Sequence, residues 1–223
     1  MSAALVSFSA CSNAGLRAEN QDSFVLGSIC SPPSIDSLEI AGRWSTNHGS
    51  FAVIDGIGGY SDGAFAAAII ADELAHGDEP RIALSSANAR LYALDREKGG
   101  NAPGAVCTGI HLTPHGVQLF SVGDTRAYHY AGGIFMALTN DDVDGSGLLT
   151  ASIGGRTHPT AEAVTTRPLD LRQGDRLLLC TDGVSGPLPF DALGLAIEQD
   201  ASASELVRLA VEAGSRDNAT AWV

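Results

Sequence analysis

Short apolar runs, several of them alternating with polar residues, recur along most of the chain and predict a protein built largely of β-strands. Such runs, bounded by glycine, proline, serine or aspartate, are typical of strands. The predicted strands lie at residues 3–10, 23–26, 51–54, 105–112, 117–122, 126–130, 134–138, 162–169, 176–180 and 219–223. Where consecutive strands are separated by only a few turn residues, we expect antiparallel pairing, because a parallel crossover needs about a dozen residues.

Helical segments interrupt the strands in two places. They are predicted at residues 64–75, 80–98, 190–199 and 205–213. Pro80 suits the first turn of its helix, and the two glycines after residue 98 end that helix. Ser202 and Glu205 have the spacing of a capping box at the start of the last helix. The chain therefore alternates runs of strands with pairs of helices.

Two polar segments separate these elements. Residues 27–49 contain prolines, serines and glycines, and we expect a long loop there with at most a short edge strand at 38–40. Residues 139–147, TNDDVDGSG, are acidic and also predict a loop. Their aspartates suit either a solvated turn or a cation-binding loop, although their spacing does not fit an EF-hand.

Four aspartates stand at the ends of predicted strands. Asp55 follows the apolar run 51–54 and precedes glycines at 56, 58 and 59, so the stretch 51–63 reads as strand, carboxylate, flexible turn and helix. Asp182 repeats this arrangement after the run 176–180. Asp124 lies where two strands are interrupted, and Asp217 opens the last strand. If these strands lie side by side, the four carboxylates converge at one end of a sheet.

Converging carboxylates cannot all stay ionised unless cations bind between them. Hard oxygen ligands suit Mg²⁺ or Mn²⁺, and two such ions activate a water and bind a phosphoryl group. Arg17, between the first two strands, is the best candidate to complete a phosphate site. The alternative, that these are four unrelated loop aspartates and an ordinary hairpin loop, stays open at this point.

Composition narrows the choice of function. Thirteen basic and 26 acidic residues give a formal net charge of −13, which argues against nucleic-acid binding. No apolar run approaches the roughly 18 to 20 residues of a membrane span, and the first residues lack the basic segment of a signal peptide. The four cysteines have no metal-site spacing and indicate free thiols in a reducing compartment, hence the cytoplasm. The chain's 223 residues fit one domain.

Five ordered motifs resemble one enzyme family. They are R-x-x-N-Q-D at 17–22, V-I-D-G-I-G-G at 53–59, G-D-T-R-A-Y at 123–128, L-L-L-C-T-D-G at 177–183 and R-D-N-A-T at 216–220. Together they resemble the PP2C-type (PPM) metal-dependent protein phosphatases, particularly compact bacterial ones. Each motif alone is a weak signal, but the set spans nearly the whole chain in the family's order.

The resemblance implies an α+β fold, a four-layer α-β-β-α sandwich of two antiparallel sheets flanked by helices. It also implies a hydrolase for signalling, which dephosphorylates phosphoserine and phosphothreonine by metal-activated water with two or three Mn²⁺ or Mg²⁺ ions. Residues 1–223 would form a single PP2C-like domain. The expected partners are phosphorylated proteins and a cognate Ser/Thr kinase, with no nucleic acid, no membrane and a monomeric state.

The resemblance assigns roles to individual residues. Asp55 would bridge two metals, and the Gly56 carbonyl would bind one of them. Asp182 and Asp217 would complete the shell of the other, and Asp124 would help Asp182 to hold a third.

Three further residues also receive roles. Arg17 would bind the substrate phosphate, and Asp22 would support the metals directly or through water. Asn218 would order the terminal loop. The residues expected to take part directly in catalysis are thus Arg17, Asp55 and Asp182.

The chain departs from the family at several positions. Bacterial members usually end the glycine turn with histidine, where this chain has Tyr60, and the position of an animal-type histidine acid is Ile57. A metal-bound water would then supply the proton that a serine leaving group needs. The flap of bacterial members is reduced here to about residues 139–153. A non-catalytic phosphoprotein-binding domain and a small-molecule phosphomonoesterase are the alternative functions.

Overall fold

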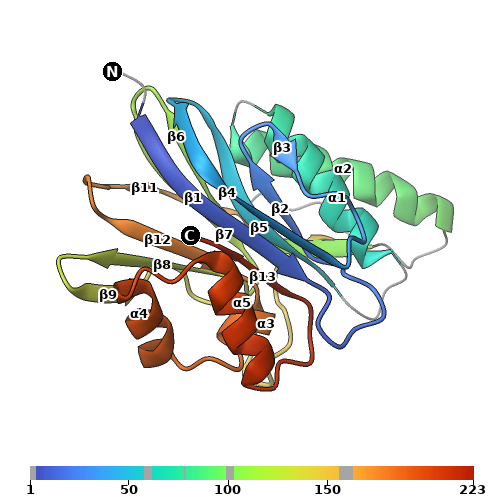
Figure 1. Ribbon diagram of the computed structural model, residues 1–223. Coiled ribbons are helices and arrows are strands. Elements are labelled where there is room, and N and C mark those ends of the chain that lie inside the picture. The colour runs from blue at the N-terminus through green and yellow to red at the C-terminus, as the bar shows by residue number, and fades with distance from the viewer. Residues whose placement is uncertain (1–3, 58–61, 78, 99–102, 156–162) are drawn as a thin grey trace.

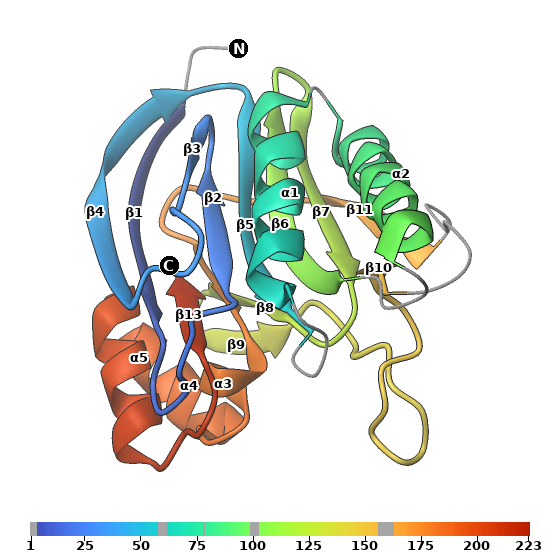
Figure 2. The ribbon, with the colours of Figure 1, turned by 90° about the vertical axis from the view of Figure 1, so that its right-hand side faces the viewer.

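The chain forms two antiparallel β-sheets packed face to face, with helices on both outer faces (Figures 1 and 2). The computed structural model describes residues 4–57, 62–77, 79–98, 103–155 and 163–223. The predicted turn glycines 58 and 59, and Tyr60, lie outside these ranges. All strand pairings in the described residues are antiparallel, as the short turns predicted.

One sheet has six strands in the order β4-β1-β13-β12-β8-β9. These are β1 (Ala4–Asn13), β4 (Ser37–Thr46), β8 (Arg126–Ala131), β9 (Ile134–Ala137), β12 (Arg176–Cys180) and β13 (Ala219–Trp222). Three helices cover its outer face: α3 (Asp182–Ser185), α4 (Phe190–Glu198) and α5 (Ala203–Glu212). We call this the C-terminal sheet.

The other sheet has seven strands, six of them in the order β11-β7-β6-β5-β2-β3, with β10 paired to β6. They are β2 (Ser23–Leu26), β3 (Ile29–Cys30), β5 (Gly49–Gly56), β6 (Gly104–Thr113), β7 (Gly116–Val122), β10 (Ile153–Gly154) and β11 (Thr165–Leu169). The two longer helices, α1 (Gly63–His76) and α2 (Pro80–Lys98), cover its outer face.

The apolar runs that predicted strands are explained by burial on both faces. Along β5, Phe51 and Val53 pack between the sheets, whereas Ala52 and Ile54 pack under α1 and α2. β12 does the same, with Leu177 and Leu179 between the sheets and the intervening residues under α3, α4 and α5. A strand with a helix layer on one side and a second sheet on the other has no side chains facing solvent. Its sequence is therefore a continuous apolar run without alternating polar residues.

Helix prediction was largely confirmed, and the capping box is present. The Ser202 hydroxyl accepts a hydrogen bond from the Glu205 N–H at 3.3 Å, and the Ser202 N–H donates to the Glu205 carboxylate at 2.7 Å. The four-residue helix α3 had not been predicted. None of the described helices is long and apolar enough to span a membrane.

The prediction of a loop over residues 27–49 was wrong in its central part. β4 occupies Ser37–Thr46 and pairs with β1 over its whole length. Its side chains alternate between partly buried and exposed over most of the strand. The serines, glycine and polar residues of this edge strand conceal that alternation in the sequence, because only one of its faces contacts the core.

Candidate functional site

The candidate residues meet where the chain crosses between the two sheets. The connection from β1 to β2 carries Arg17 and Asp22, and the connection from β7 to β8 carries Asp124. Each connection leaves one sheet and enters the other. The prediction that the carboxylates gather at the end of a single sheet was therefore incomplete, and the segment 17–22 is no hairpin loop, because β1 and β2 belong to different sheets.

A cavity of about 530 Å³ opens at this end of the sandwich. It is lined by six of the residues singled out from the sequence: Arg17, Asp55, Gly56, Asp124, Asp182 and Asp217. Gln21, Ile57 and Val106 contribute to its wall. The remaining two candidates, Asp22 and Asn218, are buried and do not line it. The structure thus brings together residues that are up to 200 positions apart in the sequence.

Asp22 is held by a network of buried hydroxyl groups. Its side chain is almost fully buried, and one carboxylate oxygen accepts a hydrogen bond from the Thr181 hydroxyl at 2.9 Å. The Thr181 hydroxyl oxygen accepts in turn from the Thr220 N–H at 3.0 Å, and the Thr220 hydroxyl contacts Ser12 at 2.8 Å. These contacts tie the crossing loop to β12, β13 and β1, and they fix Asp22 behind the cavity.

Burial and mutual repulsion raise the pKa of four of the carboxyl groups. Burial raises the pKa of Asp22 to about 7 and that of Asp124 to about 6, and the nearby Asp182 contributes to both. The pKa of Asp55 lies well above its usual range because the group is buried and faces Asp22, Asp182, Asp124 and Asp217. Burial, followed by Asp217, raises the pKa of Asp182. The site therefore concentrates negative charge that protein groups do not neutralise.

The donor set fits a hard divalent cation. Its side-chain donors are carboxylates, the oxygen ligands that Mg²⁺ and Mn²⁺ prefer. The Oδ1 atoms of Asp22 and Asp182 are buried without a hydrogen-bond partner, which is costly for a carboxylate unless a cation compensates it. Among the described residues, no three His, Cys, Asp or Glu side chains converge as a complete ligand set.

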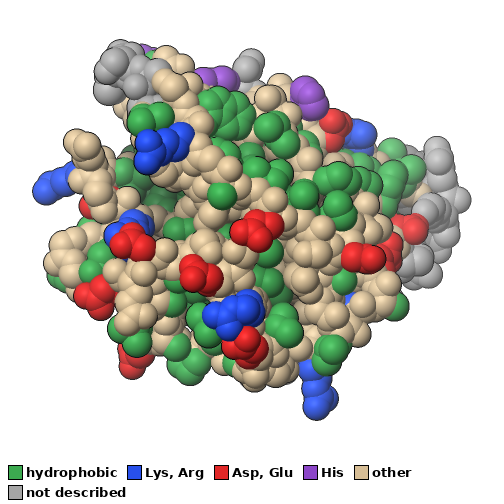
Figure 3. Space-filling view, in the orientation of Figure 1, with side chains coloured by type: hydrophobic (Ala, Val, Ile, Leu, Met, Phe, Trp, Pro, Cys, Tyr) green, Lys and Arg blue, Asp and Glu red, His purple; other side chains and the backbone are tan. Residues whose placement is uncertain are grey.

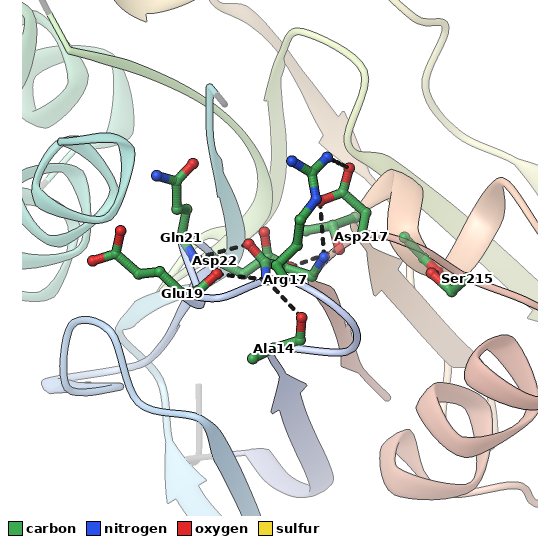
Figure 4. A network of polar contacts seen from close by, with 10 residues as sticks. Ala14, Arg17, Glu19, Gln21, Asp22, Ser215 and Asp217 are labelled. Atoms are coloured by element: carbon green, nitrogen blue, oxygen red, sulfur yellow. Dashed lines mark hydrogen bonds and ion pairs between the residues drawn. The ribbon is translucent and has the colours of Figure 1, made fainter. Parts of the chain in front are cut away.

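Arg17 supplies the positive charge at the rim of the cavity. One of its terminal nitrogens donates to Asp217 Oδ2 at 2.6 Å, and both side chains are about half exposed (Figure 4). An exposed pair of this kind contributes little to stability. The guanidinium can therefore exchange this carboxylate for another oxyanion at small energetic cost.

Asn218 holds the loop that carries Arg17. Its side-chain oxygen accepts from the Gln21 N–H, and its amide nitrogen donates to the carbonyls of Ala14 and Glu19, each at 2.9 Å. Both ends of the crossing loop are thus bound to one buried amide next to Asp217. The resemblance implies that Asn218 orders the terminal loop; in the structure its side chain binds the loop that carries Arg17.

In both Asp-Gly pairs of the site, the position after the aspartate has no room for a side chain. A side chain on Gly183 would collide with the Asn218 carbonyl, and one on Gly56 would lie 2.7 Å from the Gln21 carbonyl and still closer to that of Gly63. Each glycine therefore lets a neighbouring segment approach the backbone beside a site aspartate.

Part of the acidic segment after β9 forms a wall that the sequence did not assign to the site. Gly147, Leu148, Leu149 and Ser152 line the cavity, and Leu148 is 68% exposed. These residue types do not ligate metals or bind phosphate in a recognisable pattern. The only sequence signal for their place at the site was that they lie within the predicted flap, residues 139–153. No histidine of the described residues lines the cavity, and Ile57 stands in its wall.

The aspartates of this segment have structural partners. Asp141 binds Arg126 through two hydrogen bonds of 2.9 and 2.6 Å. Asp142 accepts from the Gly123 N–H at 2.9 Å and thereby fixes the turn before Asp124. Asp144 accepts from local backbone groups. These contacts favour the turn interpretation over a separate cation-binding loop.

Known proteins resemble the chain in sequence and in structure. The serine/threonine protein phosphatase PstP of Mycobacterium tuberculosis (strain H37Rv) is 29% identical over 203 residues, which cover 77% of this chain and 39% of PstP. The chain thus spans about two fifths of that relative's length. No family model matches the sequence.

Solved structures share the fold along nearly the whole chain. PppA, described as a key regulatory component of T6SS in Pseudomonas aeruginosa, superposes with a TM-score of 0.79 at 21% identity, covering 98% of this chain and 97% of PppA. The catalytic domain of PstP in complex with two manganese ions gives a TM-score of 0.75 at 28% identity, with 98% and 97% covered. The predicted α-β-β-α fold is confirmed, and the resemblance to PP2C-type (PPM) phosphatases is supported by both sequence and structure.

Replacing Asn218 is expected to loosen the arginine loop. Asn218→Ala removes the three side-chain hydrogen bonds of a buried amide and should lower the free energy of unfolding by about 2 to 3 kcal/mol. It should also weaken binding of inorganic phosphate, because the loop that positions Arg17 loses both anchors. Urea unfolding and phosphate calorimetry measure the two effects. Asn140→Ala, at an exposed asparagine, is the matched control, and equal phosphate affinity in both variants would contradict the assigned role.

The carboxylate cluster also predicts a pH dependence for the metal-free protein. The pKa values of Asp22 and Asp124 are higher in the folded chain than the ordinary aspartate value, so the folded state binds protons more tightly than the unfolded state. The stability contributed by these two groups is present in full below the ordinary aspartate pKa and is lost as the pH rises through the raised values. With EDTA present, the free energy of unfolding should fall by on the order of 2 kcal/mol between about pH 5 and about pH 8.

Asp22→Asn supplies the control for this dependence, since the amide keeps the shape and cannot ionise. Its stability should vary less across the same pH range, as measured by urea unfolding. A metal-free wild type whose stability rises over that range would contradict the raised pKa values.

Proposed function

We propose that this chain is a metal-dependent protein serine/threonine phosphatase, a phosphoric monoester hydrolase of the PP2C type. The observation that carries the proposal is the meeting of four cavity-lining aspartates and one arginine at the end of the sandwich. The same residues stand in the family's motifs, in the family's order. The similarity to PstP, a serine/threonine protein phosphatase, supports the same reaction.

Asp55, Asp182 and Asp217, with the carbonyl of Gly56, are the proposed ligands of two Mn²⁺ or Mg²⁺ ions, and Asp124 with Asp182 would hold a third. PstP's catalytic domain, which binds two manganese ions, supports this assignment. Bound there, such cations supply Lewis acidity that activates water and offsets the charge of the phosphate. The buried, unpaired oxygens of Asp22 and Asp182 are the groups that most need this compensation.

The chain's own residues bind and orient the substrate. Arg17 would leave Asp217 and bind the phosphate, because its guanidinium can donate two parallel hydrogen bonds to one oxyanion. Asp22, fixed by Thr181, would keep the ligand carboxylates in place. No histidine of the described residues lines the cavity, so the proton for the leaving serine or threonine oxygen would come from water.

The acidic surface of the molecule favours substrates that carry positive charge. Figure 3 shows acidic side chains spread over one face of the molecule, with fewer basic ones between them. With a net charge of −13, the protein should favour phosphorylated segments that carry basic residues. We expect phosphoproteins as substrates and a kinase as the opposing enzyme. Free thiols throughout the described residues support a role in the cytoplasm, and one chain contains the whole proposed site.

A non-catalytic role is not favoured, because every aspartate expected of an active member is present. Activity on small phosphate esters alone is likewise not favoured by the similarity to a protein phosphatase. The proposal treats residues 1–223 as a single catalytic domain, with residues 139–153 as its reduced flap.

Activity should depend on the metal and on Asp182. With Mn²⁺, the purified protein is expected to hydrolyse p-nitrophenyl phosphate and a phosphothreonine peptide, and EDTA should abolish both activities. Asp182→Asn should lower kcat by about a hundredfold or more, because it weakens the metal and phosphate interactions that stabilise the transition state. Asp144→Asn, in the neighbouring acidic segment, is the matched control and should keep normal activity.

Calorimetry with Mn²⁺ measures metal binding separately, so that a lack of hydrolysis can be distinguished from a lack of metal binding. The proposal is wrong if the wild type binds Mn²⁺ yet hydrolyses neither substrate. Full activity in Asp182→Asn would contradict the role given to that residue.

Arg17 should act on binding more than on the chemical step. Arg17→Ala is expected to raise KM for the phosphopeptide by about tenfold or more, and Arg17→Lys should recover only part of the loss because lysine cannot bind the phosphate through two parallel donors. Steady-state kinetics at saturating Mn²⁺ provide the measurement. Arg208→Ala, an exposed arginine on α5, is the control, and an unchanged KM in Arg17→Ala would exclude the phosphate contact.

A further inference from the structure

Strand β4 forms an open edge of the C-terminal sheet, beside β1 (Figure 2). Its register with β1 runs unbroken through all ten residues, from Ser37 opposite Asn13 to Thr46 opposite Ala4. It contains no proline, lysine or bulge, and no charged side chain points toward the core. Proteins commonly use those features, and exposed charges, to keep an edge strand from pairing. β4 carries only exposed charges, Glu39 and Arg43 of opposite sign, so its edge is open to a partner strand that matches them.

The backbone groups that face this edge can be identified from the neighbouring bonds. Ser9 exchanges two hydrogen bonds of 2.9 Å with Val223, so the odd-numbered residues of β1 face β13. The even-numbered ones face β4, as the bond from the Ala14 N–H to the Asp36 carbonyl also indicates. Even-numbered residues of β4 therefore bind β1. The residues whose N–H and C=O groups point to the open edge are Ser37, Glu39, Ala41, Arg43 and Ser45.

The side chains of these same five residues are exposed, and their order is self-complementary about Ala41. We propose that two copies of this chain pair antiparallel through β4, with Ala41 on the two-fold axis. Glu39 then lies opposite Arg43 of the second copy, and Arg43 opposite its Glu39. Ser37 lies opposite Ser45 in the same way. Opposite charges directly across a sheet stabilise the pairing, and Ser204 already orients Glu39 through a 2.7 Å hydrogen bond.

The inner face of β4 is complementary in the same register. Leu38, Ile40 and Trp44 are partly buried and pack against the core between the sheets. The two-fold places Ile40 opposite Gly42 of the second copy and Leu38 opposite its Trp44. A large residue thus meets a small one at the centre, and apolar residues meet at each end. The pairing also uses only residues whose backbone groups are available, since each odd-numbered residue faces an odd-numbered one.

We expect a second copy of this chain at this edge, because one register matches the charges, the side-chain sizes and the free backbone hydrogen-bonding groups of the two strands. Such an interface is isologous, as a two-fold dimer requires, and it joins two six-stranded sheets into one. None of the residues lining the candidate site belongs to β4, so both sites stay open in the dimer.

Charge reversal tests the pairing in the full-length chain. Sedimentation velocity from about 1 to about 100 µM should show a dimer whose dissociation follows mass action. Arg43→Glu places two acidic residues opposite each other twice, and it should weaken the dimer by about tenfold or more. The double variant Glu39→Arg with Arg43→Glu restores both opposite pairs and should restore the dimer. Arg81→Glu, the same charge change on α2 beyond the other sheet, is the control.

Cysteine crosslinking tests the register. Ala41→Cys should form a disulfide-linked dimer under mild oxidation, because the two cysteines face each other across the axis. Ser45→Cys should not, since its two copies lie about 26 Å apart at roughly 3.3 Å per residue. The wild type, with its four cysteines, measures the background.

A wild type that stays monomeric over the whole concentration range overturns the proposal. So does a dimer that Arg43→Glu leaves intact, or one in which Ser45→Cys crosslinks as well as Ala41→Cys. Circular dichroism checks that each variant is folded. If the double variant recovers the dimer, the loss in Arg43→Glu was caused by charge alone.

Discussion

The repulsion among buried carboxylates is the constraint on which the site depends. Asp55 is repelled by four other aspartates: three line the cavity with it, and Asp22 lies buried behind it. Such a cluster is unfavourable for the folded chain by itself, and the surrounding fold has to hold it together. It does so with the hydroxyl network behind Asp22 and the Asn218 amide, both built from groups that lie deep in the sandwich. A cation bound between these carboxylates would offset this cost in stability.

The two-sheet architecture decides where this cluster can form. A chain that passes from one sheet to the other must leave the hydrogen-bonded ladder, and both crossings next to β5 and β12 place polar residues at the same end of the core. Arg17, Asp22 and Asp124 come from such crossings. Asp55 lies in β5, and Asp182 opens α3 directly after β12; both strands are buried on both faces. Rigid strands therefore fix the central carboxylates, while the crossing loops supply the groups at the rim.

Much of this could be predicted from the sequence, because the informative signals were local. Helix boundaries followed from the caps, and the two Asp-Gly pairs after apolar runs identified Asp55 and Asp182. The predictions that failed concerned contacts between segments far apart in the sequence. Nothing in the sequence near Asp124 shows that β7 and β8 lie in different sheets, and β4 was missed because an edge strand with one buried face carries a weak apolar pattern. The wall at Leu148 was missed for a related reason, since its position depends on the path of a segment with little regular structure.

We propose that Asp55 would hold two divalent cations together with Asp182 and Asp217. A crystal of the wild-type protein soaked in Mn²⁺, with anomalous scattering measured at the manganese edge, tests it most directly. We expect two strong peaks on either side of the Asp55 carboxylate, within coordination distance of Asp182 and Asp217, and an Arg17 side chain separated from Asp217. Peaks elsewhere, or none beside Asp55 with Arg17 still bound to Asp217, would contradict it.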